Sequence, residues 1–226
     1  MLTALLDLVL PGACVGCGRP GEQPLCASCG RPDPAVVPGL GVPAAAGGSY
    51  DAALRQALLK YKERGRRDLA GLLGSYLAAA LLRLDLPPGA VLVPVPSSVA
   101  ARRERGGDHL RPVARAAGRR CGVAVLPALR LGRAVQDSAG LTLAERAANI
   151  DDALRARAPR YPRRSAVLVD DIVTTGATAR EGVRALRAAG WTVCGAAMVA
   201  ATPPATPSTT PAAPGTRRPG ERTVLP

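Results

Sequence analysis

Two adjacent carboxylates, Asp170 and Asp171, follow an apolar run and precede a segment rich in hydroxyl groups and glycine. The run is Ala-Val-Leu-Val at residues 166–169, and Ile-Val-Thr-Thr-Gly-Ala-Thr follows the acids. This order predicts a buried strand that ends in two acids, then a loop that opens a helix. Because a helix N-terminus presents unpaired N–H groups and partial positive charge, the loop is suited to bind a phosphate monoester.

The loop and the acids together indicate a sugar phosphate as ligand. Adjacent acids at the carboxyl end of a strand lie where open α/β sheets bind ligands, and they can accept hydrogen bonds from a cis-diol. A phosphate on one side and a diol on the other describe a ribose 5-phosphate. The alternative is an ordinary capped turn, which calls for neither the two acids nor the threonines. The candidate phosphate-binding residues are Thr174, Thr175, Gly176, Ala177 and Thr178.

Four of the six cysteines stand in two close pairs, Cys14-x2-Cys17 and Cys26-x2-Cys29. Two residues between thiolates let one tight turn direct both sulfurs at a single tetrahedral ion, and neighbouring glycines suit such turns. The spacing predicts a structural Zn²⁺ held by all four cysteines, which leaves no coordination position of the ion open for a substrate or a reactive water. Two disulfides or a redox-active pair are the alternatives.

The elements that position these groups alternate between strands and helices after residue 91. Runs rich in Val, Leu and Ala predict strands without polar alternation, which suits a parallel sheet covered on both faces. We therefore expect an α/β fold with a small N-terminal zinc-binding segment. The predicted strands are residues 91–95, 123–126, 166–169 and 192–199, and the predicted helices are residues 110–120 and 178–189.

The part of the chain before residue 91 predicts two helices within residues 50–84, where Leu, Ala and Tyr recur at helical spacing. The charged residues 60–67 between them form either a solvated turn or a phosphate-facing patch. Residues 32–48, rich in Pro and Gly, predict a linker, and the seven prolines of the last segment predict a disordered tail. The expected division is a zinc-binding segment at 1–40, connecting helices at 50–90, the main domain at 91–201 and the tail at 202–226.

The chain of 226 residues has a formal net charge of +13, and residues 51–201 carry 25 basic and 13 acidic side chains. Such an excess indicates an anionic partner, either nucleic acid or a polyphosphorylated small molecule. The alternative is compositional bias, since 28 of the 30 basic residues are Arg. Hydrophobic residues make up 47% of the chain, which excludes disorder over most of its length.

No run of eighteen apolar residues occurs, so no membrane span is expected. The apolar residues 1–10 lack a basic n-region and contain Asp7, which argues against a signal for export. We therefore expect a cytoplasmic protein whose thiols stay reduced.

The two acids followed by Thr-Thr-Gly-x-Thr resemble the phosphoribosyl diphosphate (PRPP) signature of type I phosphoribosyltransferases, which have a parallel sheet flanked by helices. Over roughly residues 1–201, further motifs resemble the ComF family of competence and amidophosphoribosyltransferase-like proteins. They are Leu-Leu-Asp-Leu-Val-Leu-Pro before the cysteines, Lys60-Tyr61-Lys62, Val93-Pro94-Val95-Pro96-Ser97, Arg102-Arg103-Glu104-Arg105-Gly106, Gln136, Arg146 and Asn149.

The resemblance implies an enzyme that binds PRPP with Mg²⁺ and transfers its phosphoribosyl group to an acceptor that the sequence does not identify. Asp170 and Asp171 would hold the ribose hydroxyls and stabilise positive charge on the ring. A loop after the first strand of the main domain would contact the diphosphate, and a mobile loop at residues 130–149 would close over PRPP. The implied contacts are Pro96, Ser97 and Ser98 in the first loop, and Arg133, Gln136 and Arg146 in the second.

The chain departs from the family where Arg-Gly-Phe-Asn is common, because residues 105–108 read Arg-Gly-Gly-Asp. This weakens any role assigned to that stretch. His109, the only histidine, comes next, and as a lone histidine that begins a helix it is interpreted as a surface or capping residue rather than a base. Nothing nearby in the sequence supports a Ser-His-Asp triad around it.

The second functional hypothesis is a binding module that keeps the fold for PRPP sensing, or as an accessory of the DNA-uptake machinery, as the ComF resemblance implies. The basic central region and the cysteine knuckle suit single-stranded DNA electrostatically. Only five aromatic residues are present, however, so platforms for stacked bases are scarce.

Overall fold

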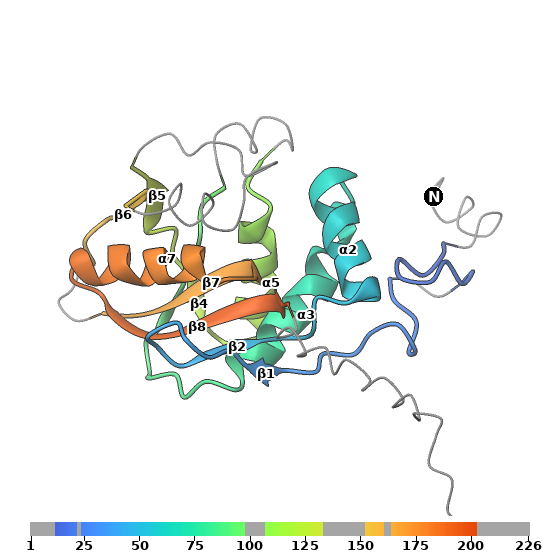
Figure 1. Cartoon of the computed structure of the whole chain (residues 1–226), viewed down its shortest axis with the longest axis horizontal. Helices are drawn as coiled ribbons and strands as arrows, with labels where there is room; N and C mark the ends of the chain where they lie inside the picture. Colours follow the sequence, from blue (N-terminus) through green and yellow to red (C-terminus); the bar gives the residue numbers. More distant parts are fainter. Residues whose placement is uncertain (1–11, 22–23, 98–106, 133–151, 161–163, 203–226) are drawn as a thin grey trace, which may run out of the picture.

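The computed structural model describes residues 12–21, 24–97, 107–132, 152–160 and 164–202, and the fold is given for these (Figure 1). Its centre is a six-stranded sheet in the order β1-β2-β8-β7-β3-β4, in which β1 alone is antiparallel to its neighbour. The strands are β1 (Ala35–Val36), β2 (Ala44–Ala46), β3 (Val91–Pro94), β4 (Ala124–Val125), β7 (Ser165–Val173) and β8 (Thr192–Ala201). The expected α/β fold with a mostly parallel sheet is confirmed.

Helices cover the sheet, and a small hairpin stands beside it. Residues Ala166 to Val169 of β7 are completely buried, because helices lie over both faces of this central strand. The helices are α2 (Ala52–Glu63), the 3-10 turn η1 (Arg67–Leu69), α3 (Ala70–Leu81), α5 (Leu110–Cys121) and α7 (Ala177–Ala188). The antiparallel hairpin consists of β5 (Leu129–Leu131) and β6 (Leu154–Ala156).

Helices α5 and α7 lie on opposite faces of the sheet. Gly118 of α5 packs close to Leu92 of β3, whereas Gly182 of α7 packs closely against Leu168 of β7. Leu92 is in register with Val167, so these two side chains share a face. Because successive residues of a strand point to opposite sides, Leu168 faces the other way. Glycine at both helix positions lets the helices approach the sheet closely.

The connections reverse direction between β3 and β7, which pair side by side. From β3 the chain passes through α5 to β4 at one edge, whereas from β7 it passes through α7 to β8 on the other side. Such a reversal leaves the loops after the two adjacent strands diverging, and it opens a crevice at their carboxyl ends. The reversal therefore favours a ligand site between the carboxyl ends of β3 and β7.

Two parts of the chain differ from the sequence expectation. The predicted linker contains β1 and β2, and β2 extends the main sheet by pairing in parallel with β8. Its three alanines carry no recognisable strand pattern, but they are buried where β8 offers an unpaired edge. The charged residues 60–63 continue α2 as far as Glu63 instead of forming a turn.

The N-terminal segment packs on α2 and α3, beyond the sheet in Figure 1. Val15 belongs to the hydrophobic core, and Lys60 Nζ donates to the Val15 carbonyl at 3.0 Å. Gly30 lies so close to Tyr76 of α3 that a side chain there would collide with the phenol oxygen. In the described residues no helix is both long and apolar enough to cross a bilayer.

Candidate functional site

The first residues after β3 lie beside β7, at the crevice between these strands. The Val95 N–H donates to the Val169 carbonyl at 2.9 Å, which continues the ladder just past the end of β3. Pro96 and Ser97 follow and are half-buried. On the neighbouring strand, Asp170 and Asp171 occupy the carboxyl-terminal half of β7 and are also half-buried. The structure thus brings the acid pair beside the implied diphosphate loop.

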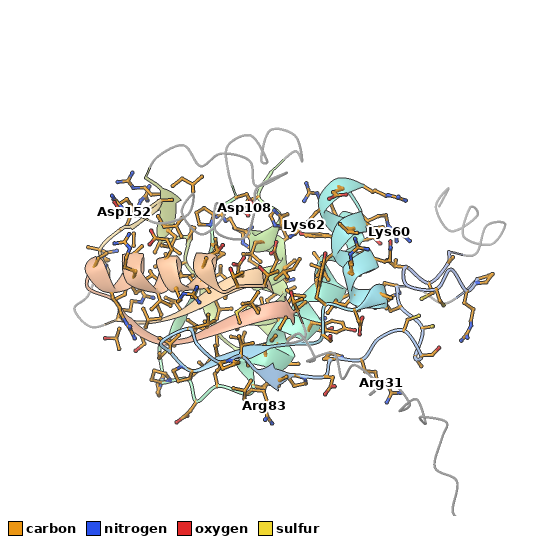
Figure 2. All side chains as sticks on the ribbon, in the orientation of Figure 1. Arg31, Lys60, Lys62, Arg83, Asp108 and Asp152 are labelled. Carbon is orange, nitrogen blue, oxygen red and sulfur yellow. The ribbon has the colours of Figure 1, made fainter. Side chains whose placement is uncertain are left out.

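Asp171 is the centre of a chain of polar contacts from three segments. Its Oδ2 lies 2.5 Å from Lys62 Nζ of α2 and 2.8 Å from His109 Nε2. The other ring nitrogen of His109, Nδ1, lies 3.0 Å from Ser97 Oγ. Figure 2 shows Lys62 between α2 and the segment of Asp108, whereas Lys60 lies on the side of α2 toward the N-terminal segment. Of the charged residues 60–67, Lys62 therefore faces the site.

The two acids differ in their electrostatic surroundings. Burial acts to raise the pKa of Asp171, but the Lys62 ammonium and the His109 ring outweigh it and hold this pKa well below the ordinary range. Burial and the negative charge of Asp171 raise the pKa of Asp170 to about 7, against a 2.8 Å hydrogen bond from the Asp171 N–H. The surroundings therefore favour the ionised form of Asp171 and the protonated form of Asp170.

The threonine loop, residues 174–176, connects β7 to the N-terminus of α7. Thr174 and Thr175 are exposed, so their hydroxyls are accessible to a ligand. Gly176 has a φ of +76°, and a Cβ there would come within 2.5 Å of Leu40 Cδ2. Only glycine fits this turn without strain. Arg180, one turn into α7, donates to the Thr175 carbonyl at 2.9 Å and places a cation beside the loop.

A cavity of about 460 Å³ adjoins the threonine loop. Its other wall comes from the segment around β1, including Val36 and Leu40, and from Ser49. The exposed Val36 side chain makes this wall largely apolar. The predicted linker therefore contributes a wall to the space next to the candidate phosphate loop, a part that the sequence pattern did not indicate.

Several predicted contacts lie outside the described residues, namely Ser98, Arg133, Gln136 and Arg146. The structure does show where the second implied loop is anchored. Strands β5 and β6 pair in antiparallel register, with Leu131 opposite Leu154. Leu131 and Leu154, which are described and lie on either side of this segment in the chain, are therefore neighbours. Ala177 and Thr178 begin α7 directly after the threonine loop.

The four predicted zinc ligands form one cluster. The Sγ atoms of Cys14, Cys17, Cys26 and Cys29 all lie within 4.8 Å of one another, and those of Cys17 and Cys26 are 3.7 Å apart. Four sulfurs at 2.3 Å from one tetrahedral ion would lie about 3.8 Å apart, so the cluster fits Zn²⁺. Burial raises the pKa of the Cys14 thiol, but backbone N–H donors outweigh this and lower it to about 6. This favours the thiolate at Cys14, whereas the side-chain hydrogen bonds of Cys29 with Cys17 and Cys26, together with burial, raise the pKa of Cys29 to about 12.

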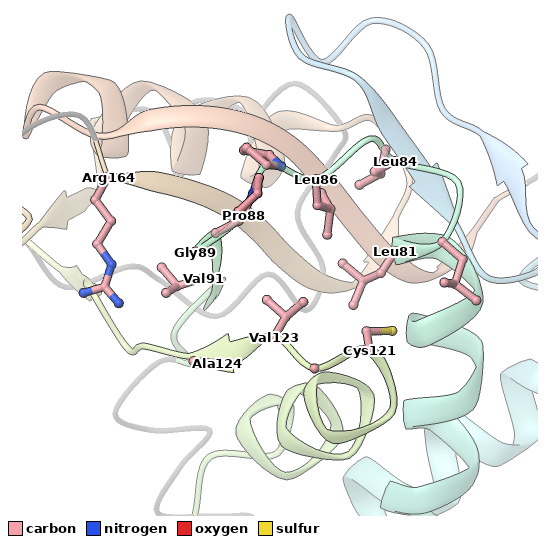
Figure 3. A pocket seen from close by; sticks show the side chains of 14 residues that line it. Leu81, Leu84, Leu86, Pro88, Gly89, Val91, Cys121, Val123, Ala124 and Arg164 are labelled. Carbon is pink, nitrogen blue, oxygen red and sulfur yellow. The ribbon is translucent and has the colours of Figure 1, made fainter.

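A cavity of about 550 Å³ lies at the opposite end of the strands from the crevice, near their amino-terminal ends (Figure 3). Arg164 stands at one end and Cys121 at the other, with Val91 and Val123 between them. Among the described residues Arg164 is the one charged residue that lines it. This cavity therefore lacks the paired acids and hydroxyls that distinguish the crevice between β3 and β7.

Sequence reasoning missed the part that His109 plays. It occupies the N-cap position of α5, but its side chain makes no capping bond there, and the residue is buried. The interpretation as a surface or capping side chain is therefore wrong. Ser97 and Asp171 are distant from it in sequence, so no spacing could have shown this contact.

Comparisons with known proteins give limited information. No family model matches the chain, and the search of curated proteins found no match. Among solved structures, a UMP synthase from Leishmania donovani aligns with 64% of this chain at 18% identity and a TM-score of 0.35. The aligned region spans only 24% of that protein. A likeness this distant carries no argument about function, which must come from the site itself.

Proposed function

We propose that this protein binds PRPP together with Mg²⁺ and transfers its phosphoribosyl group to an acceptor still to be identified. One observation carries the proposal. The acid pair lies between a glycine-containing hydroxyl loop at a helix N-terminus and a second loop at the neighbouring strand end. Phosphate, cis-diol and diphosphate groups of one ligand match these three parts in order.

The two acids have separate tasks in this proposal. Asp171, held ionised by Lys62 and His109, accepts hydrogen bonds from the ribose hydroxyls. Its fixed charge also stabilises the positive charge that develops on the sugar ring as diphosphate departs. Asp170, whose pKa is raised, is able to hold a proton near neutral pH and so to donate a hydrogen bond as well as accept one.

The remaining groups position the two ends of the ligand. The threonine loop receives the 5-phosphate through its N–H groups and hydroxyls, and Arg180 adds positive charge. Ser97 faces the diphosphate. Mg²⁺ would neutralise diphosphate oxygens, and it fits best on oxygens of the ligand, because Oδ2 of Asp171 already receives two nitrogen donors.

We assign a structural Zn²⁺ to the four cysteines, and we propose that roughly residues 1–201 belong to the ComF family. The cysteine cluster and the order of the motifs along the chain support this assignment. The expected domain division, the cytoplasmic location and the link to competence and single-stranded DNA stay predictions. A non-catalytic PRPP-binding protein is the alternative that the same site supports.

Calorimetric titration with PRPP, with and without Mg²⁺, tests the proposal. We expect PRPP with Mg²⁺ to bind more tightly than ribose 5-phosphate or diphosphate alone, since it fills all three parts of the site. Release of diphosphate in the presence of candidate acceptors then distinguishes the enzyme from the binding protein. Absence of PRPP binding by the metal-loaded full chain would refute the proposal.

A further inference from the structure

His109 connects the two halves of the site directly. Its ring touches Asp171 of β7 through Nε2 and Ser97, just beyond β3, through Nδ1. Its side chain is only 10% exposed. Its backbone is also fixed, because the Tyr61 hydroxyl donates to the His109 carbonyl at 2.7 Å. The ring is therefore held in place, and both of its nitrogens have partners.

The contacts define which nitrogen carries the proton when the ring is neutral. An ionised carboxylate only accepts hydrogen bonds, so Nε2, at 2.8 Å from Asp171 Oδ2, must be the N–H. Nδ1 is then the acceptor, and the hydroxyl of Ser97 must donate to it. In this state Ser97 has only lone pairs to offer any other group, which is unfavourable for binding an anion.

Protonation of the ring reverses the Ser97 hydrogen bond. With both nitrogens protonated, Nδ1–H donates to Ser97 Oγ, and the hydroxyl proton becomes available to an anion in the loop. The same serine thus repels or attracts an anion according to the charge of the ring beside it.

Charged groups of both signs lie around the ring in the described part of the chain. Asp171 of β7 favours the charged ring, whereas Lys62 of α2 opposes it and is paired with the same carboxylate. Asp170 lies next to Asp171, and the Asp108 carboxylate accepts from the Leu110 N–H at the start of α5. An anion bound near Ser97 adds negative potential, which favours the charged ring.

We infer that His109 is a positioning residue that orients the Ser97 hydroxyl, and that a diphosphate group bound at Pro96 and Ser97 draws one proton from solvent onto Nδ1. This rests on the proposed function, since it takes the loop after β3 to be the diphosphate site. No covalent bond changes; the proton comes from the buffer and returns to it when the anion leaves. Affinity for diphosphate then falls with rising pH, by up to about tenfold per pH unit.

Nitrogen-15 NMR of the full chain, prepared without a histidine tag, tests this directly, because the chain contains a single histidine. In free protein at alkaline pH we expect the Nε2–H tautomer with Nδ1 unprotonated. Saturation with inorganic diphosphate and Mg²⁺ at the same pH should protonate Nδ1. An Nδ1 that stays unprotonated in the saturated complex overturns the inference.

Calorimetry in buffers of different ionisation enthalpy gives an independent readout. The wild type should take up more protons on binding diphosphate than His109→Gln, whose amide can still donate to Asp171 but does not titrate. Ser97→Ala should lose this extra uptake as well. Equal uptake by wild type and His109→Gln would refute the role of the ring.

The two proposals fail in different ways. If PRPP binds with Mg²⁺ but binding does not change the protonation of the His109 ring, the inference about His109 is wrong and the proposed function stands. If neither PRPP nor diphosphate binds the wild type, both are wrong.

Discussion

The cysteine segment, residues 12–30, and the crevice between β3 and β7 are assembled in different ways. All four sulfurs of the segment come from one short stretch of chain, and two tight turns bring them together. The crevice takes Lys62, Ser97, His109 and Asp171 from four separate segments, and only the sheet and its helices make them neighbours. A local site can be identified from spacing, whereas a composite site depends on the fold.

The comparison also separates structural from chemical roles. The cysteine cluster offers four ligands and packs through Val15 on the core, which suits a metal that holds the segment in place. The crevice offers an acid pair with opposite pKa shifts. Variants in one region should therefore leave the other largely intact, and the following predictions are ordered from the largest expected effect to the smallest.

Loss of a zinc ligand should have the largest effect, confined to the segment. Structural Zn²⁺ stabilises small metal-binding peptides by about 10 kcal/mol or more, so Cys26→Ser should lose bound zinc and fast hydrogen exchange should appear at residues 12–30. Metal analysis and exchange of the sheet amides check this, with Cys121→Ser as the control outside the cluster. A protein without zinc would contradict the assignment, and loss of PRPP binding in Cys26→Ser would break the separation between the regions.

Removal of both acid charges should weaken PRPP binding at the crevice and leave zinc binding by the cysteine segment unchanged. For Asp170→Asn with Asp171→Asn we expect PRPP affinity to fall at least about 100-fold, equivalent to about 2.7 kcal/mol, because the diol loses its ionised acceptor. Calorimetry measures the affinity, and zinc content should not change. Asp85→Asn, an exposed acid near the opposite edge of the sheet, is the matched control. Unchanged affinity in the double variant would refute the site.

Gly176→Ala should weaken the threonine loop by an intermediate amount. The positive φ and the contact with Leu40 are expected to lower the free energy of unfolding by about 1–3 kcal/mol, and to reduce PRPP affinity. Gly71→Ala is the control, because Gly71 lies within α3 with open space around it, and alanine there should stabilise the helix by up to about 1 kcal/mol. Denaturant unfolding measures the free energy of unfolding, which should fall in Gly176→Ala and rise in Gly71→Ala. Equal changes in the two variants would argue against a strained loop.

The smallest effect concerns the pH dependence of stability. Because the pKa of Asp170 is raised to about 7, the folded state keeps a proton that the unfolded state has released between about pH 4 and pH 7. Wild-type stability should therefore fall as pH rises through this window. Asp170→Asn should remove this loss, on the order of 1 kcal/mol after solvent screening. Denaturant unfolding curves at pH 4 and pH 8 measure the free energy of unfolding of both proteins. The same change with pH in wild type and Asp170→Asn would contradict the raised pKa of Asp170.

Much of the fold could be read from the sequence because its patterns are local. The apolar run at residues 166–169 and the helix after Gly176 have clear apolar and glycine signals and lie where expected, but β7 continues through Asp170 and Asp171 to Val173 instead of ending at the acids. Strand β2 could not be identified, because three alanines between proline and glycine become a strand only when the edge of β8 is available to them.

The sequence by itself determined the cysteine cluster, the acid pair and the threonine loop, since each is defined by residues close together in the chain. Only the tertiary structure decided the partners of the acids. Lys62 was one member of an ambiguous charged stretch, and His109 had no distinguishing neighbour in the sequence. The folded arrangement of the sheet and its helices brings both onto Asp171, His109 from the start of α5 and Lys62 from the end of α2, because contacts between distant segments follow from the tertiary fold and not from spacing along the chain.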